Sequence, residues 1–152
     1  MKKNILIIIL SILFVGGIVF GIIFFKDAFN RSNNELIKYE EELLDIKISD
    51  CIEKATGKVN TYDEYEDYAD IVFKIKDGKY EELKSIIDEK FSNFKKGESS
   101  YDMYEKMFRM KKGDLELTDI YGKFLTGKRA KTREVFAFFY IEDGSYYLYL
   151  MG

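Results

Sequence analysis

Residues 131–151 read KTREVFAFFYIEDGSYYLYLM, and this stretch carries the strongest fold signal in the chain. β-Branched and aromatic residues, which favour strands, lie on both sides of Asp143-Gly144. This dipeptide is typical of a two-residue hairpin turn. We therefore expect antiparallel strands over 131–142 and 145–151.

The first of these strands is apolar on both faces. Val135, Ala137 and Phe139 point to one side. Phe136 and Phe138 point to the other. A strand with one face in water alternates apolar and polar residues, so the second face needs its own cover from helices, sheet curvature or a partner, unless it lines a pocket. We take its aromatic residues as the candidate binding surface: Phe136, Phe138, Tyr140, Tyr147 and Tyr149.

Helices are expected ahead of the strands. Apolar residues at helical spacing predict four of them, over 33–47, 61–76, 79–94 and 101–112. In the last, Met103, Met107 and Met110 are expected to face the core. A period of two over 115–125 predicts a strand before the hairpin. The expected fold class is α+β, with about four helices followed by a three-stranded antiparallel meander.

The expected helix over 61–76 begins with a capping box. Thr61 and Glu64 have the spacing at which a hydroxyl and a carboxylate each accept an amide N–H. The carboxylates of this helix are interpreted as a solvated face, because no glycine loop or carbonyl ligand accompanies them as a Ca²⁺ site requires. They are Asp63, Glu66, Asp67 and Asp70.

The N-terminal part is unlike the rest. Ile5–Phe25 is an apolar run of about the length that crosses a bilayer as a helix. It predicts an uncleaved single-pass signal anchor in the cell membrane, with Lys2 and Lys3 inside and the later domain outside the cytoplasm. The alternative is a secreted protein released by signal cleavage. The expected segments are a transmembrane signal anchor (1–26), an acidic juxtamembrane helix and linker (27–60) and an α+β domain (61–152).

Composition excludes several chemistries. The chain has no histidine and one cysteine, Cys51, so it offers no histidine base, no histidine zinc ligand and no internal disulfide. We expect no catalytic residues, no metal and no cofactor. If the chain were an enzyme, Glu134 and Tyr140 would be the acid and base candidates.

A basic turn precedes the second strand. It is interpreted as a solvated turn, with the alternative of a patch for anionic wall polymer or lipid headgroups. Nucleic acid is not expected as a partner, because aromatic residues do not alternate with these bases as stacking platforms. The patch consists of Lys128, Arg129, Lys131 and Arg133.

The order of elements around KIKDGKYEELKSIIDEKFSNF (74–94) resembles small extracytoplasmic NTF2-like (cystatin-like roll) domains of bacteria. The resemblance covers about 62–151 and implies a curved antiparallel sheet in a binding domain or an enzyme. The chain departs from the pattern in having few predicted strands and no recognisable catalytic dyad. It also resembles type IV pilin-like subunits, although the expected Gly-Phe cleavage site and the following glutamate are missing.

These observations give two hypotheses. The first is a membrane-anchored, extracytoplasmic, non-catalytic protein that docks a protein partner or a second copy through its aromatic sheet face. The alternative is an NTF2-like pocket that binds or hydrolyses a small ligand. A pilin-like subunit is the less favoured reading.

Overall fold

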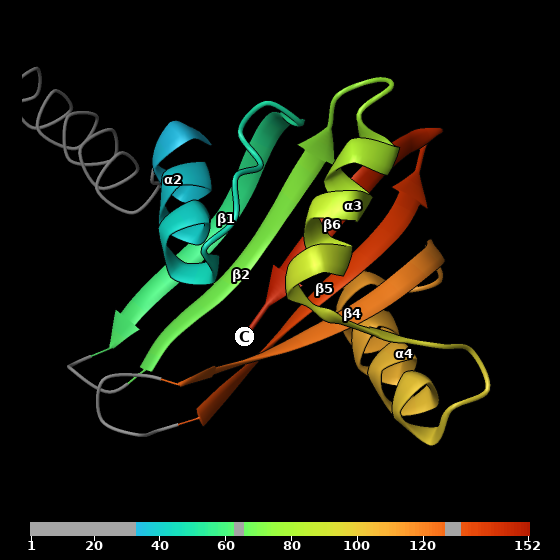
Figure 1. The fold of residues 1–152 in the computed structure, drawn as a ribbon. Coiled ribbons are helices and arrows are strands. Elements are labelled where there is room, and N and C mark those ends of the chain that lie inside the picture. Colours follow the sequence, from blue (N-terminus) through green and yellow to red (C-terminus); the bar gives the residue numbers. More distant parts are fainter. Residues whose placement is uncertain (1–32, 63–65, 127–131) are drawn as a thin grey trace, which may run out of the picture. The chain divides into compact units, whose positions relative to one another are not determined.

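The computed structural model describes residues 33–62, 66–126 and 132–152. They belong to one compact unit, Ser32–Gly152, built on a six-stranded antiparallel sheet with the strand order β1-β2-β6-β5-β4-β3 (Figure 1). The elements are α2 (Asn33–Leu44), β1 (Ile52–Tyr62), β2 (Glu66–Ile75), α3 (Tyr80–Lys90), β3 (Ser92–Phe94), α4 (Ser99–Lys112), β4 (Glu116–Thr126), β5 (Thr132–Glu142) and β6 (Ser145–Met151).

The predicted terminal hairpin is present as β5 and β6. Tyr140 pairs with Tyr147 across it, and Asp143 and Gly144 form its turn with φ angles of 49° and 73°. Both angles are positive, as a type I′ turn requires. β6 and β5 are the two middle strands of the sheet, and helices cover them on both sides, which explains why both of their faces are apolar.

Helices cover the sheet on both sides. α2 and α3 lie on one face and α4 lies on the other (Figure 1). We call these the α2–α3 face and the α4 face. Of the twenty buried residues in the cluster on the α2–α3 face, four are aromatic. Of the eight on the α4 face, six are aromatic. The two hydrophobic cores therefore differ in kind.

The expected fold class is wrong. In the described residues the chain forms six strands and three helices, not about four helices followed by a three-stranded meander. The meander exists as β4, β5 and β6, but it is half of a larger sheet. β1 and β2 pair with each other through residues that were expected to be a linker and a helix.

The error at 61–76 has a clear cause. Ile71, Phe73 and Ile75 are buried at a spacing of two, and they face the same core as β6. Pairing on both sides satisfies the backbone of β2 and buries these side chains, which a helix at the surface does not achieve. The helix-like spacing of apolar residues and the capping box at 61–64 favour a helix locally, but strand pairing on both sides of β2 outweighs them.

Gly57 permits the close approach of β1 to β2. Its φ is 153°, and a Cβ atom there would meet the backbone of Asp70 and lie 2.7 Å from Cα of Ile71. Only glycine fits this position without displacing the neighbouring strand.

The expectation of a transmembrane helix is corrected for the described residues. Within 33–62, 66–126 and 132–152, no helix is long and apolar enough to cross a membrane, because each is short and carries charged side chains. The predicted span, Ile5–Phe25, lies outside these residues.

Candidate functional site

The structure brings the predicted aromatic residues together beneath α4. Phe138 stacks on Tyr149 with ring centroids 5.8 Å apart, and Tyr140 stacks on Tyr147 at 5.2 Å. Phe136, Phe138, Tyr140 and Tyr149 are buried, and Tyr147 is half-buried against the same cluster. Their surface is buried inside the domain, so these side chains do not form an exposed docking surface.

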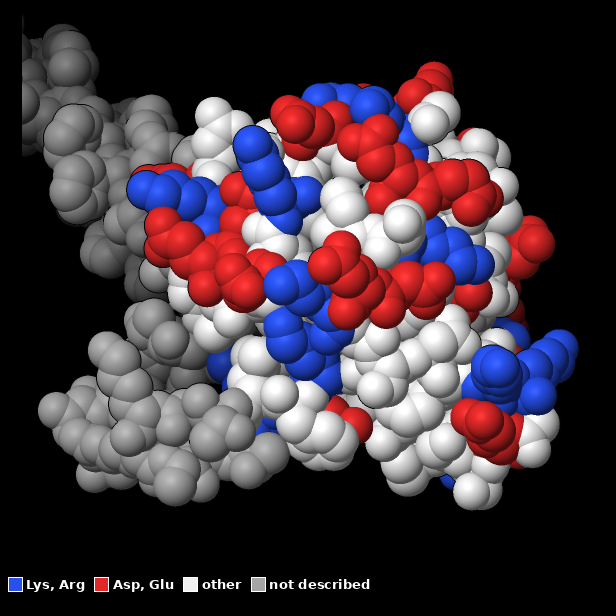
Figure 2. Space-filling view, viewed as in Figure 1, with Lys and Arg blue, Asp and Glu red and all other residues white. Residues whose placement is uncertain are grey.

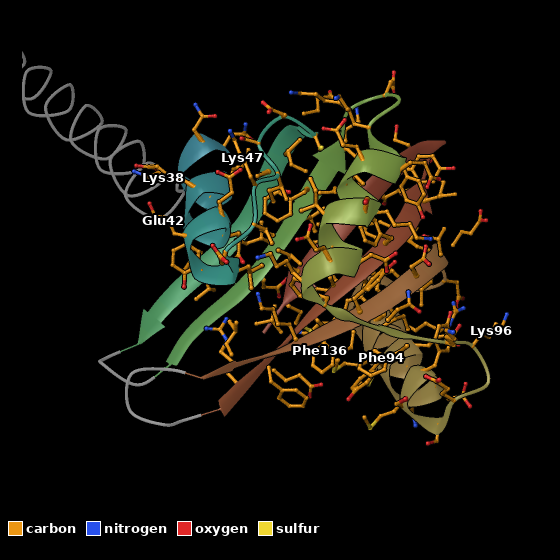
Figure 3. All side chains as sticks on the ribbon, viewed as in Figure 1. Lys38, Glu42, Lys47, Phe94, Lys96 and Phe136 are labelled. Carbon is orange, nitrogen blue, oxygen red and sulfur yellow. The ribbon has the colours of Figure 1, made fainter. Side chains whose placement is uncertain are left out.

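Two aromatic residues fix α4 to the sheet. Phe108 is fully buried, with its ring 5.4 Å from that of Phe138. Tyr104 packs between Phe94 and Phe136, with ring centroids 4.7 and 4.5 Å away; Figure 3 labels Phe94 and Phe136. This packing determines which side of α4 faces solvent.

The methionines of α4 do not all face the core as expected. Met107 packs partly against the aromatic cluster, but Met103 is 57% exposed and Met110 is 74% exposed. At about 100° per residue, Met103 and Met110 lie about 20° apart and more than 100° from Phe108. The aromatic residues occupy the inner side, so the prediction for Met103 and Met110 is wrong.

The outer side of α4 is hollowed and charged. A shallow depression of about 470 Å³ runs along it, and Arg109 binds Glu105 there at 2.7 Å. Asp102 is acidic in the first turn, whereas the last turn is basic. The lining residues are Asp102, Glu105, Lys106, Arg109 and Met110. This surface combines flexible thioethers with opposite charges at its two ends, which suits a protein partner better than catalysis.

A second unusual feature is buried on the α2–α3 face. Glu40 is the one buried charged residue in the described part of the chain, and neither of its carboxylate oxygens has a hydrogen-bond partner there. Burial raises the pKa of Glu40 to about 7, and the positive charge of Arg133 acts in the opposite direction. Sequence reasoning missed Glu40, although it interrupts the apolar stripe between Leu36 and Leu44.

Arg133 is the basic side chain whose charge acts on Glu40. Arg133 donates from Nη2 to the Gly152 carbonyl oxygen at 2.9 Å, while its Nε is buried and has no partner among the described residues. Glu40 and Arg133 form what we call the buried polar cluster. Lys123 lies at the end of α2, where its Nζ donates to the Leu44 carbonyl oxygen at 2.6 Å, and burial lowers the pKa of Lys123.

The acid and base candidates do not form a dyad. Tyr140 is buried, and burial raises its pKa. Glu134 accepts a hydrogen bond from the Tyr104 hydroxyl at 3.3 Å. Six residues separate Glu134 from Tyr140 on β5, which corresponds to about 20 Å in an extended strand. Proton transfer between them is therefore not possible in this structure.

The remaining predicted sites are only partly described. Lys128, Arg129 and Lys131 of the basic patch lie outside the described residues, which leaves Arg133. Among residues with a described placement, no group of three or more potential ligands is arranged to hold a metal ion. Cys51 is buried, and burial raises its pKa to about 11, which fits the packing role expected of it.

A small cleft of about 320 Å³ lies where the β2–α3 loop meets the β5–β6 turn. Tyr80 and Tyr146 stack on one of its sides with ring centroids 4.2 Å apart. The Tyr80 hydroxyl donates to Asp119 at 2.9 Å, and Lys84 binds the same carboxylate at 2.8 Å. These contacts link α3 to β4, and we interpret them as structural.

The chain matches no known family model, and searches of curated proteins and of solved structures find no significant match. The geometry alone therefore carries the functional argument.

Proposed function

We propose that this chain is a non-catalytic interaction protein that pairs with a second copy through the outer side of α4. The observation that carries the proposal is the exposure of Met103 and Met110 on one side of that helix. Methionine is flexible and polarizable, and it is common on surfaces that adapt to a partner. The lack of histidine and the burial of Cys51 support a non-catalytic role.

An antiparallel arrangement of the two helices fits the charges. A two-fold axis between Lys106 and Met107 places Met103 of one copy opposite Met110 of the other. It also places the acidic Asp102 end beside the basic end of the second helix. The two helix dipoles then oppose each other favourably. A parallel arrangement would instead bring like charges together at both ends.

The pairing should be weak. α4 has 14 residues, so the surface that it offers is smaller than a standard protein interface. We expect a dissociation constant of about 10 μM to 1 mM. Attachment to a membrane through Ile5–Phe25, and a location outside the cytoplasm, stay predictions from the sequence. Such attachment would raise the effective concentration of the two copies.

Cross-linking of single cysteine variants tests the arrangement. In the full chain in neutral detergent micelles, Lys106→Cys lies beside the proposed axis and should give a covalent dimer with a short bis-maleimide. Met103→Cys should not, because the two positions would lie about 10 Å apart along the helices. The unsubstituted chain, whose buried Cys51 is the same in both variants, gives the background.

Two results would contradict the proposal. Equal cross-linking of Lys106→Cys and Met103→Cys would exclude the antiparallel pairing. Sedimentation showing that Met103→Ser/Met110→Ser dimerises as well as the unsubstituted chain would exclude α4 as the interface. We expect that double variant to weaken pairing by at least about tenfold.

A second candidate function is a small-ligand site at the buried polar cluster. The unpartnered carboxylate of Glu40 favours it, because buried polar groups normally have partners. Native mass spectrometry of the full chain should then show a bound small molecule that is lost from Arg133→Gln. An unchanged protein mass in both would eliminate this candidate.

A further inference from the structure

The two sides of the sheet differ in charge. α2 and α3 together contain eight acidic residues and three lysines, whereas α4 contains two acidic and four basic residues. Figure 2 shows many acidic side chains, with basic ones among them, over the side that carries α2 and α3. The net positive charge of α4 therefore favours an anionic partner on the α4 face.

Part of the α4 face bears lysines on the sheet itself. Ala55 and its neighbours at a spacing of two face α2, so Lys54 and Lys58 of β1 project from the opposite side, where both are exposed. Lys54 is paired directly with Lys74 of β2. Like charges directly opposite each other destabilise a sheet. The Lys54–Lys74 pair therefore does not help the fold, and a bound anion would relieve the repulsion between the two lysines.

The end of α4 adds two more lysines beside these strands. Lys111 reaches Asp70 of β2 at 4.0 Å, and Lys112 lies over the ring of Tyr149 at 4.4 Å from its centroid. Asp70 is itself paired with Lys58 across the β1–β2 ladder. The lysines of the strands and of the helix end therefore form one cluster, which we call the lysine array: Lys54, Lys58, Lys74, Lys111 and Lys112.

Few acids neutralise the lysine array. Glu53 binds Lys74 at 3.0 Å and, together with Asp77, raises the pKa of that lysine. Asp70 lies 4.0 Å from Lys111. Neither Lys54 nor Lys58 has an ion-pair partner among the described residues. These two lie four residues apart, or about 13 Å along an extended strand.

We infer that the lysine array binds a linear polyanion of the phosphate-polymer type. The lysines stand at two levels, because Lys111 and Lys112 belong to a helix that packs on top of the sheet face bearing Lys54 and Lys58. A narrow, flexible chain of phosphates reaches both levels, whereas a flat bilayer surface meets the helix first. This inference does not depend on pairing through α4.

Binding of long-chain inorganic polyphosphate to the full chain in neutral detergent micelles tests the inference. Lys54→Gln/Lys58→Gln/Lys111→Gln should weaken binding by at least about tenfold and reduce the salt dependence of the affinity between about 50 and 200 mM salt. Each side chain is at the surface, so the fold should persist, and a circular dichroism melt checks this.

A matched control removes the same charge elsewhere. Lys38→Gln/Lys95→Gln/Lys96→Gln changes three exposed lysines that do not belong to the lysine array; Figure 3 shows Lys38 beside α2 and Lys96 in the segment ahead of α4. It should change the affinity less than about twofold. Equal loss in both triple variants would show attraction by net charge and would overturn the inference. Lysine-dependent binding to phosphatidylglycerol vesicles without polyphosphate binding would also overturn it, in favour of a lipid surface.

Discussion

The two faces of the sheet are closed in different ways. The α2–α3 face has a mainly aliphatic core that also contains a carboxylate, Glu40, on which the charge of Arg133 acts. The α4 face has an aromatic core with no buried charge among the described residues, and its helix exposes methionine on the outside. The unusual residue of the α2–α3 face is a carboxylate in its interior, whereas the unusual residues of the α4 face are methionines at its surface.

This difference shows that apolar residues on a sheet do not by themselves mark a binding face. The aromatic residues of β5 and β6 are the packing surface of α4, which leaves the helix exterior available to partners. The polar residue of interest lies on the opposite face, within an otherwise apolar helix stripe. Four substitutions test the comparison.

Phe108→Ala should have the largest effect. Phe108 is fully buried against Phe138 and Tyr140, and replacing a buried aromatic residue by alanine costs about 3–5 kcal/mol. Urea unfolding of the full chain measures this loss. Met110→Ala, two residues away and exposed, is the matched control and should stay within about 0.5 kcal/mol. A similar loss in both variants would mean that α4 is packed differently.

Gly57→Ala should have the second largest effect and lower the free energy of unfolding by about 2–4 kcal/mol. The new Cβ meets the backbone of β2, and the φ of 153° disfavours alanine. Thr56→Ala, at the adjacent exposed position, should change stability by less than about 0.5 kcal/mol. The same unfolding measurement applies. A stable Gly57→Ala variant would contradict the β1–β2 pairing that closes the α2–α3 face.

Glu40→Gln should stabilise the fold at high pH. Burial raises the pKa of Glu40 to about 7 in the folded state. The fold is therefore most stable below the pKa that Glu40 has in the unfolded chain, and it loses this stability as the pH rises through 7, because the carboxylate must then be buried with its charge. At pH 8 the substitution should gain about 2–3 kcal/mol, and at pH 5 less than about 1 kcal/mol.

Unfolding free energies of Glu40→Gln between pH 5 and pH 8 provide the measurement. Glu42→Gln on the same helix is the control, because the Glu42 side chain is 71% exposed and should give no pH-dependent difference. If Glu40→Gln showed the same gain at both pH values, Glu40 would not be a buried titrating group.

Tyr80→Phe should have the smallest effect. It removes the hydroxyl that donates to Asp119 between α3 and β4, which corresponds to a loss of about 1 kcal/mol. Tyr146→Phe, in the ring stacked on Tyr80, has no such hydrogen bond and should be neutral. Thermal unfolding compares the two, and equal stability would mean that the Asp119 contact contributes nothing to the α2–α3 face.

Local patterns predicted some elements well and others wrongly. The β5–β6 hairpin was predictable, because Asp143-Gly144 and the strand residues around it favour the same structure. The helix α4 was also predicted, and Gly113 follows it with a φ of 73°. β1 was missed because most of its residues were expected to be a linker, and β2 was missed because the spacing of apolar residues over 61–76 fits a helix as well as a strand. Only pairing with β6 decides between them.

The sites divide in the same way. The sequence pattern grouped Phe136, Phe138 and Tyr140 with Tyr147 and Tyr149, and these five residues share one face, but the pattern contained no information on what covers them. Lys54, Lys58 and Lys111 lie far apart in the chain and meet only through strand pairing and helix packing.

The sequence by itself determined some local features of this protein: the terminal hairpin, the three helices α2, α3 and α4, and the chemistry excluded by the lack of histidine. The tertiary structure alone decided that β1 and β2 extend the sheet, that α4 covers the aromatic face and that Glu40 is buried. The physical reason is that burial depends on contacts between segments distant in sequence, whereas turns and helix spacing depend on neighbours along the chain.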